Sequence, residues 1–151
     1  MEIVNLIQQK YGELCQLRAP LTKKQCDKAR KFLPDELFEL LKISNGINEV
    51  MINPNTKKVE VIDRIIYSLA EMKTQTDCYL GEYGNEGIVF AGNGAGGFFI
   101  LKPDGRVFLY EYNDLGEEYY ANSLREYFNN FLIVQINLEN KPFYEMGKIY
   151  E

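Results

Sequence analysis

The glycine-rich stretch from Gly92 to Gly97 constrains the fold more than any other part of the sequence. It reads Gly-Asn-Gly-Ala-Gly-Gly, lies between two apolar runs, and matches the G-x-G-x-x-G fingerprint of dinucleotide-binding proteins. That fingerprint binds a pyrophosphate only where a helix begins directly after the glycines. Here the apolar run Phe98–Leu101, a turn at Pro103-Asp104-Gly105 and a second apolar run at 106–111 follow instead. The sequence therefore predicts antiparallel strands that the glycines join or bend, and not a cofactor site.

Helix signals flank these strands. Thr22, Ser68 and Ser123 each begin a capping box, in which Gln or Glu stands three residues further on, and each box predicts a helix start. Pro34 at a first helical position predicts another, which the pair Asn45-Gly46 ends. The predicted helices lie near residues 2–14, 23–32, 34–44, 68–79 and 123–134, and the predicted strands at 49–52, 58–62, 87–91, 98–101 and 106–111.

The order of these elements predicts the fold class. Turns, rather than regular helical crossovers, separate the strands, and helices stand at both ends of the chain. This arrangement favours an α+β fold in which an antiparallel sheet packs against helices. We expect one domain over residues 1–151, with a polar, tyrosine-rich loop at 112–120.

The chain contains no histidine, which excludes several kinds of catalytic site. Ser-His-Asp and Cys-His nucleophiles, imidazole acid–base chemistry and His-liganded zinc all need that side chain. The three cysteines stand far apart without a C-x-x-C pair, so we expect buried thiols rather than a metal site or a disulfide framework. The 22 acidic residues make chance carboxylate pairs abundant, and no EF-hand pattern is present. We expect no catalytic residue, no metal and no cofactor.

The net charge of the chain indicates which kind of partner it can bind. The net charge is −5 and the pI is about 4.9, whereas phosphate backbones attract basic proteins. Nucleic acid is therefore not expected as a direct ligand, and a basic protein is the more natural partner, although acidity also serves ordinary solubility. No signal pattern or run of about 20 apolar residues is present, so we expect a cytoplasmic protein without a membrane span.

Several segments together resemble one family. The segment Leu33-Pro34-Asp35-x-Leu37-x₂-Leu40-Leu41-x₃-Asn45-Gly46 resembles the "LP…L…NG" helix of the SUKH superfamily. Segments similar to the family's later motifs follow in the same order, at Ile65–Glu71, Phe90–Phe98, Val107–Tyr112 and Ala121–Phe128. The resemblance covers about residues 20–135.

The resemblance implies a binding module. Bacterial members of the superfamily are immunity proteins that neutralise secreted or contact-delivered toxins, often nucleases or deaminases, by direct binding, and fungal members are regulators of cell-wall synthesis. It thus implies a cognate toxin as the partner. The negative charge of the chain favours a basic toxin, and we expect the chain itself to be a monomer or weak homodimer. A regulatory scaffold, or a small-ligand sensor that uses the glycine-rich turn, is the alternative.

The expected interface combines tyrosines with carboxylates. Tyrosine buries a large area at low entropic cost, and acids beside it would match the Lys and Arg of a basic toxin. The segment 110–120 carries most of these side chains, and either contacts the partner or is a solvated loop with its tyrosines folded onto the sheet edge. A second polar loop precedes the central strands, and we expect it on the same edge. Asn93 is the only residue of the glycine turn whose side chain could make a polar contact with the partner. The candidate residues are Tyr110, Glu111, Tyr112, Asp114, Glu117, Glu118, Tyr119, Asn93, Glu82 and Glu86.

Overall fold

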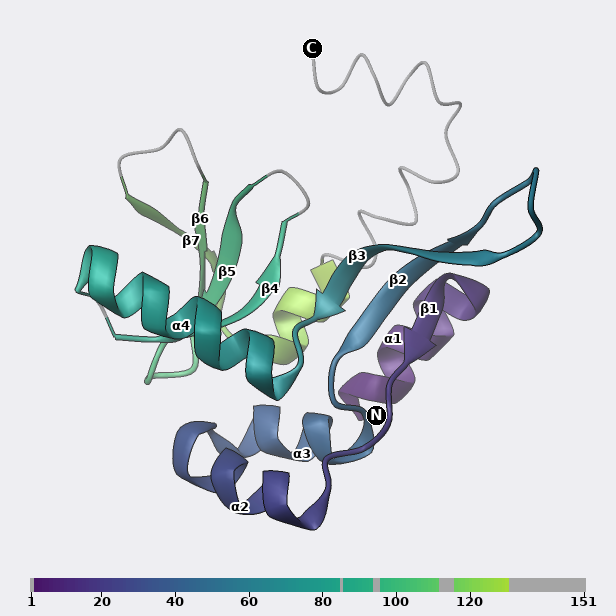
Figure 1. Ribbon diagram of the computed structural model, residues 1–151. Helices are drawn as coiled ribbons and strands as arrows, with labels where there is room; N and C mark the ends of the chain where they lie inside the picture. The colour runs from purple at the N-terminus through teal and green to yellow at the C-terminus, as the bar shows by residue number, and fades with distance from the viewer. Residues whose placement is uncertain (1, 85, 94–95, 112–115, 131–151) are drawn as a thin grey trace.

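The computed structural model describes residues 2–84, 86–93, 96–111 and 116–130, and it contains helices and antiparallel strands (Figure 1). This confirms the predicted α+β class. In chain order the elements are α1 (Ile3–Tyr11), a 3-10 turn (Gly12–Leu14), β1 (Cys15–Leu17), α2 (Lys23–Phe32), α3 (Asp35–Ile43), β2 (Ile47–Ile52), β3 (Val59–Ile66), α4 (Leu69–Tyr83), β4 (Ile88–Gly92), β5 (Phe98–Leu101), β6 (Val107–Tyr110) and β7 (Glu117–Ala121). A last helix covers residues 124–130 of the described chain.

The helix starts follow from local side-chain chemistry. At α2 the Thr22 hydroxyl accepts from the Gln25 N–H, and the Gln25 side chain accepts from the Thr22 N–H at 2.8 Å, which closes the capping box. Ser68 and Glu71 form the same reciprocal pair at α4. Helix α3 differs, because Pro34 lies before the helix with extended backbone and not at its first position as predicted. The acids of the first turn then stabilise the start of α3 through the helix dipole.

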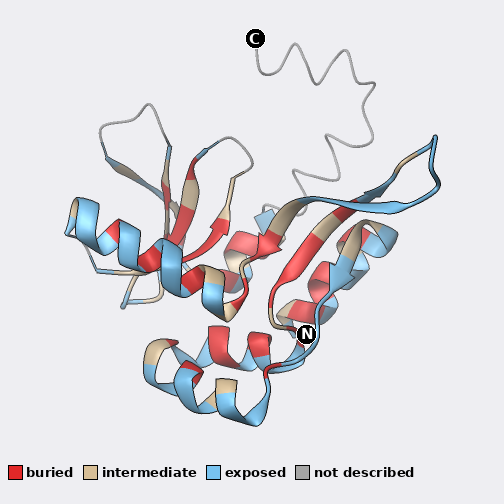
Figure 2. Ribbon diagram, in the orientation of Figure 1, coloured by how far each residue is buried: buried red, intermediate tan, exposed pale blue. Residues whose placement is uncertain are grey.

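The first sheet has the order β1-β2-β3, with both pairs antiparallel. Strands β2 and β3 form a hairpin whose turn is held by the Asn53 side chain, which accepts from the Asn55 N–H at 2.8 Å. The outer half of this hairpin projects from the body and is exposed (Figures 1 and 2). At its inner end, the Tyr67 N–H donates to the Phe90 carbonyl at 2.9 Å, which links this sheet to β4.

The second sheet has the order β4-β5-β6-β7, with all neighbours antiparallel. Successive side chains point to opposite faces of a strand, and β5 shows the consequence. Phe98 and Ile100 join the cluster beneath α4, whereas Phe99 and Leu101 join the main core. That core also receives α1, α3 and the last helix, and Figure 2 shows the buried sides of these elements turned inward. Apolar groups therefore cover both faces of this sheet.

Strand β7 corrects the prediction of a loop at 112–120. Glu117–Ala121 pairs along β6 in antiparallel register, with Tyr110 opposite Glu117. Helix α4 is also longer than predicted and continues to Tyr83. Residues 112–115 and the end of the last predicted helix lie outside the described residues.

Two further expectations concern thiols and membranes. All three cysteines are free, but Cys78 is exposed and the other two are partly exposed, so the prediction of buried thiols was wrong. Within the described ranges, no helix is both long and apolar enough to cross a membrane.

Candidate functional site

Tyr110 lies at the centre of an aromatic cluster where α4 ends against the second sheet. Its ring stacks on Phe98 of the neighbouring strand, with centroids 5.1 Å apart and planes 16° apart. The Tyr83 ring approaches from α4 at 4.7 Å. Each such aromatic pair contributes about 0.5–1.5 kcal/mol beyond its buried area. Tyr110 is therefore held by contacts with two neighbouring rings and remains partly exposed.

The Tyr83 hydroxyl stays protonated at neutral pH because its pKa is raised. A hydrogen bond with Tyr110 raises the pKa of Tyr83, and burial and the nearby carboxylate of Glu82 raise it further. A neutral Tyr83 beside Glu82 presents a hydroxyl and a carboxylate at the same end of α4. The prediction of a loop at Glu82 was wrong, because Glu82 lies in the last turn of α4, and the structure brings that turn close to Tyr110.

Glu117 is neutralised within the chain. Its carboxylate lies 2.7 Å from the Lys102 Nζ, and the two side chains are only 13% and 16% exposed. The Tyr79 hydroxyl also donates to Glu117. Lys102 in turn donates to the Tyr79 hydroxyl at 2.9 Å and to the Glu86 carbonyl at 3.1 Å. This cluster ties α4, β5 and β7 together, so Glu117 has a structural role whatever else it contacts.

The other acids predicted for the interface remain exposed. They are Glu82, Glu86, Glu111 and Glu118. Tyr119 is 51% exposed, and its ring packs edge-to-face with the Phe108 ring, with the two centroids 6.0 Å apart. We call the described residues Glu82, Tyr83, Glu86, Tyr110, Glu111, Glu118 and Tyr119 the tyrosine–acid surface. Glu118 pairs with Leu109 of the main core and so lies on the opposite face of the sheet from Tyr110 and Tyr119, which means that the surface continues around the edge strand β7. Tyr112 and Asp114 lie outside the described residues.

Asn93 holds the glycine turn from within. Its side-chain oxygen accepts from the Gly97 N–H at 2.8 Å, and its own N–H donates to the Gly97 carbonyl at 3.2 Å. A Cβ on Gly97 would lie 2.5 Å from the Tyr110 carbonyl oxygen. Glycine is therefore required at this position because the backbones of two strands pass closely. The predicted strand–turn–strand is confirmed, and it lies beside Tyr110.

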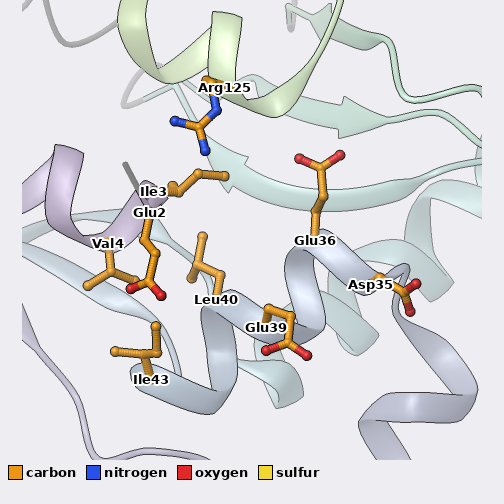
Figure 3. Close-up of a pocket in the computed structure, with 9 residues that line it drawn as sticks. All are labelled: Glu2, Ile3, Val4, Asp35, Glu36, Glu39, Leu40, Ile43 and Arg125. Carbon is orange, nitrogen blue, oxygen red and sulfur yellow. The ribbon is translucent and has the colours of Figure 1, made fainter.

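The structure also contains a groove with acidic lining residues that the sequence did not predict. A groove of about 290 Å³ lies between α1, α3 and the last helix, with Ile3, Val4, Leu40 and Ile43 among its lining residues. Figure 3 shows Glu2, Glu36 and Glu39 around it, with the Arg125 guanidinium directed toward it from the last helix. The sequence signal for this acidic groove was the spacing of Glu36 and Glu39, which stand about one helical turn apart and so lie on the same face of α3. Only the tertiary fold reveals that α1 lies beside it.

Among the described residues, no group of three or more Cys, Asp or Glu side chains is placed to hold a metal ion. The described residues of the tyrosine–acid surface thus combine packed aromatic rings and exposed carboxylates, and the largely buried ion pair of Lys102 and Glu117 lies next to them.

Comparison with known proteins identifies the fold family. The sequence model of the SMI1 / KNR4 family (SUKH-1) matches residues 23–130. The chain belongs to this family. The match begins at the first residue of α2 and includes every residue of the tyrosine–acid surface, whereas α1 and β1 precede it. No curated protein and no solved structure matches the chain.

Proposed function

We propose that this SUKH-1 protein is an immunity protein that binds a basic toxin and blocks it by direct contact. Membership of the family supports the general role. The observation that carries the proposal for this chain is the tyrosine–acid surface, in which the Tyr110 ring packs against both Tyr83 and Phe98 and the carboxylates are exposed. No catalytic step is assigned to the chain.

The physical basis is preorganisation together with charge. A tyrosine that neighbouring rings already hold in place loses little further freedom on binding, so more of its contact energy appears as affinity. The exposed carboxylates steer a positively charged partner toward the surface and raise the association rate. A toxin that acts on nucleic acid offers such a partner, since its substrate groove must attract phosphates. We therefore favour a nuclease, whose groove this surface would occupy in the cytoplasm of the producing cell.

Coexpression tests the proposal. The chain is expressed with the C-terminal domain of a toxin encoded beside it, and both growth and complex formation are measured. We expect growth to be rescued and a complex to form at micromolar concentration or below. Toxicity without rescue, and no complex at micromolar concentration, would contradict the proposal. Marked thermal stabilisation by one nucleotide, sugar or metal ion, without toxin binding, would instead favour the small-ligand sensor.

A further inference from the structure

Positive charge is concentrated on one helix of this acidic chain. Helix α2 carries five cations, Lys23, Lys24, Lys28, Arg30 and Lys31, against the single acid Asp27, which gives ten residues a charge of 5 − 1 = +4. The whole chain has a net charge of −5. A uniformly solubilising surface would intersperse the two signs. The separation therefore indicates a face suited to a partner of the opposite charge to the toxin.

Three lysines converge on a groove between α2 and α4. The groove has a volume of about 640 Å³, and its lining includes Lys28 and Lys31 from α2 and Lys73 from α4. The apolar part of the lining comes from Phe32, Leu69 and Ala70, and no acidic residue of the described chain lines the groove. We call this feature the lysine groove. It combines an apolar floor with a basic rim.

The lysines on the rim make few contacts with other side chains of the described chain. Lys73 lies over the Phe32 ring with its Nζ 5.0 Å from the centroid. Its contact with Asp77 is 4.0 Å long, with both side chains more than 60% exposed, and an ion pair of that kind contributes little. Lys28 and Lys31 are exposed and stand three residues apart on α2, so both face the same side of the helix.

The chemistry of the groove favours carboxylates on a peptide over a phosphate. The usual phosphate site at a helix start needs free backbone N–H groups. At α4 the Leu69 N–H donates to the Asn45 side chain at 2.8 Å, and the Ser68 hydroxyl caps the helix. The Thr22 side chain caps α2 in the same way. The positive charge thus comes from lysines on flexible stems, which suit carboxylates spread along a helix face.

We propose that the lysine groove binds an acidic amphipathic helix of a second protein. An apolar side chain of that helix fills the floor between Phe32 and Leu69, and its Asp and Glu residues pair with the lysine rim. Helix α4 bears the groove on its first turns and the tyrosine–acid surface at its last residue. These ends are about 20 Å apart at 1.5 Å per residue. One chain can therefore hold a basic and an acidic partner at once, and the groove is independent of the toxin site.

A selection experiment with matched variants tests the proposal. A displayed library of random 16-residue peptides is selected on the intact chain. Selected peptides are then measured against the triple variant Lys28→Gln/Lys31→Gln/Lys73→Gln and against the control variant Lys42→Gln/Lys57→Gln/Lys58→Gln, whose lysines lie outside α2 and outside the groove. Both variants remove three exposed lysines and leave the same net charge. Thermal melts of the two variants check that folding is retained.

The expected result is enrichment of peptides that carry Asp or Glu together with apolar residues at helical spacing. These peptides should bind the groove variant at least tenfold more weakly than the wild type, and the control variant within about twofold. The proposal is overturned if no such peptides are enriched or if both variants weaken binding equally. It is also overturned if inorganic phosphate or ATP binds the wild type and is lost in the groove variant while no peptide is selected.

Discussion

Replacing Lys102 with methionine should destabilise the protein strongly, because it removes the centre of a desolvated ion cluster. Lys102 pairs with Glu117 at 2.7 Å and donates to Tyr79 and Glu86, and the paired side chains are only 13–16% exposed. Breaking a buried pair by removing one partner costs about 3–5 kcal/mol. Because some solvent reaches the pair and Tyr79 still donates to Glu117, we expect about 2–3 kcal/mol of lost stability for Lys102→Met.

The same hairpin supplies a matched control. Arg106 pairs with Asp104 at the same 2.7 Å distance, but both side chains are about half exposed. Exposed pairs contribute about 0–1 kcal/mol, so Arg106→Met should cost no more than that. Urea unfolding followed by far-UV circular dichroism measures both variants, since the chain has no tryptophan to report by fluorescence.

A double variant completes the test. Glu117→Gln in the Lys102→Met background removes the orphaned charge and should recover about 1 kcal/mol or more. Equal losses for Lys102→Met and Arg106→Met would refute the reasoning, because burial would then have no influence on the strength of the pair. A lack of recovery in the double variant would show that the stranded charge is not the cause.

Three other predictions follow from single contacts. Gly97→Ala places a Cβ 2.5 Å from the Tyr110 carbonyl oxygen and should cost about 1–3 kcal/mol, whereas Gly116→Ala, with open space around it, should be near neutral in the same unfolding assay. Burial alone would raise the pKa of Glu71, but hydrogen bonds from Ser68 and Arg64 outweigh it and lower the pKa below the ordinary 4.5. The stability that the ionised Glu71 adds is thus complete above pH 4.5 and is lost as the pH falls through the lowered pKa, so the difference between wild type and Glu71→Gln should shrink over that window; a difference independent of pH would contradict this. Ser44→Ala removes a buried hydroxyl that accepts from the Arg18 N–H at 2.8 Å and should lower the free energy of unfolding by about 1–3 kcal/mol, against a negligible change for the exposed Thr74→Ala.

The sequence predicted those elements whose signals are local. Thr22 and Ser68 sit within three residues of their capping partners, and α2 and α4 begin where these boxes place them. Strand β7 was missed because its Glu-Glu-Tyr-Tyr-Ala sequence lacks the alternation of a half-buried strand. It is a strand because β6 offers it a pairing edge, which no local pattern reveals.

The candidate site, too, could be predicted from the sequence only in part. The enrichment of tyrosine and acid near residue 110 is visible in the sequence, but the fate of each side chain depends on distant partners. Glu117 pairs with Lys102 from the turn after β5, and Tyr110 contacts Tyr83 from α4. The lysine groove requires α2 and α4 to lie together. Such contacts are set by tertiary packing, so the sequence indicated the composition of the surface and not its geometry.

The affinity of charge-matched variants for the toxin tests the central claim most directly. Glu111→Lys/Glu118→Lys reverses two exposed carboxylates of the tyrosine–acid surface, and Glu13→Lys/Glu60→Lys reverses two exposed carboxylates elsewhere. Both variants change the net charge equally, so long-range attraction falls alike in each. Measured by isothermal titration calorimetry, the first variant should bind the toxin at least tenfold more weakly than the second. Equal affinities for the two variants would contradict the assignment of the toxin to the tyrosine–acid surface.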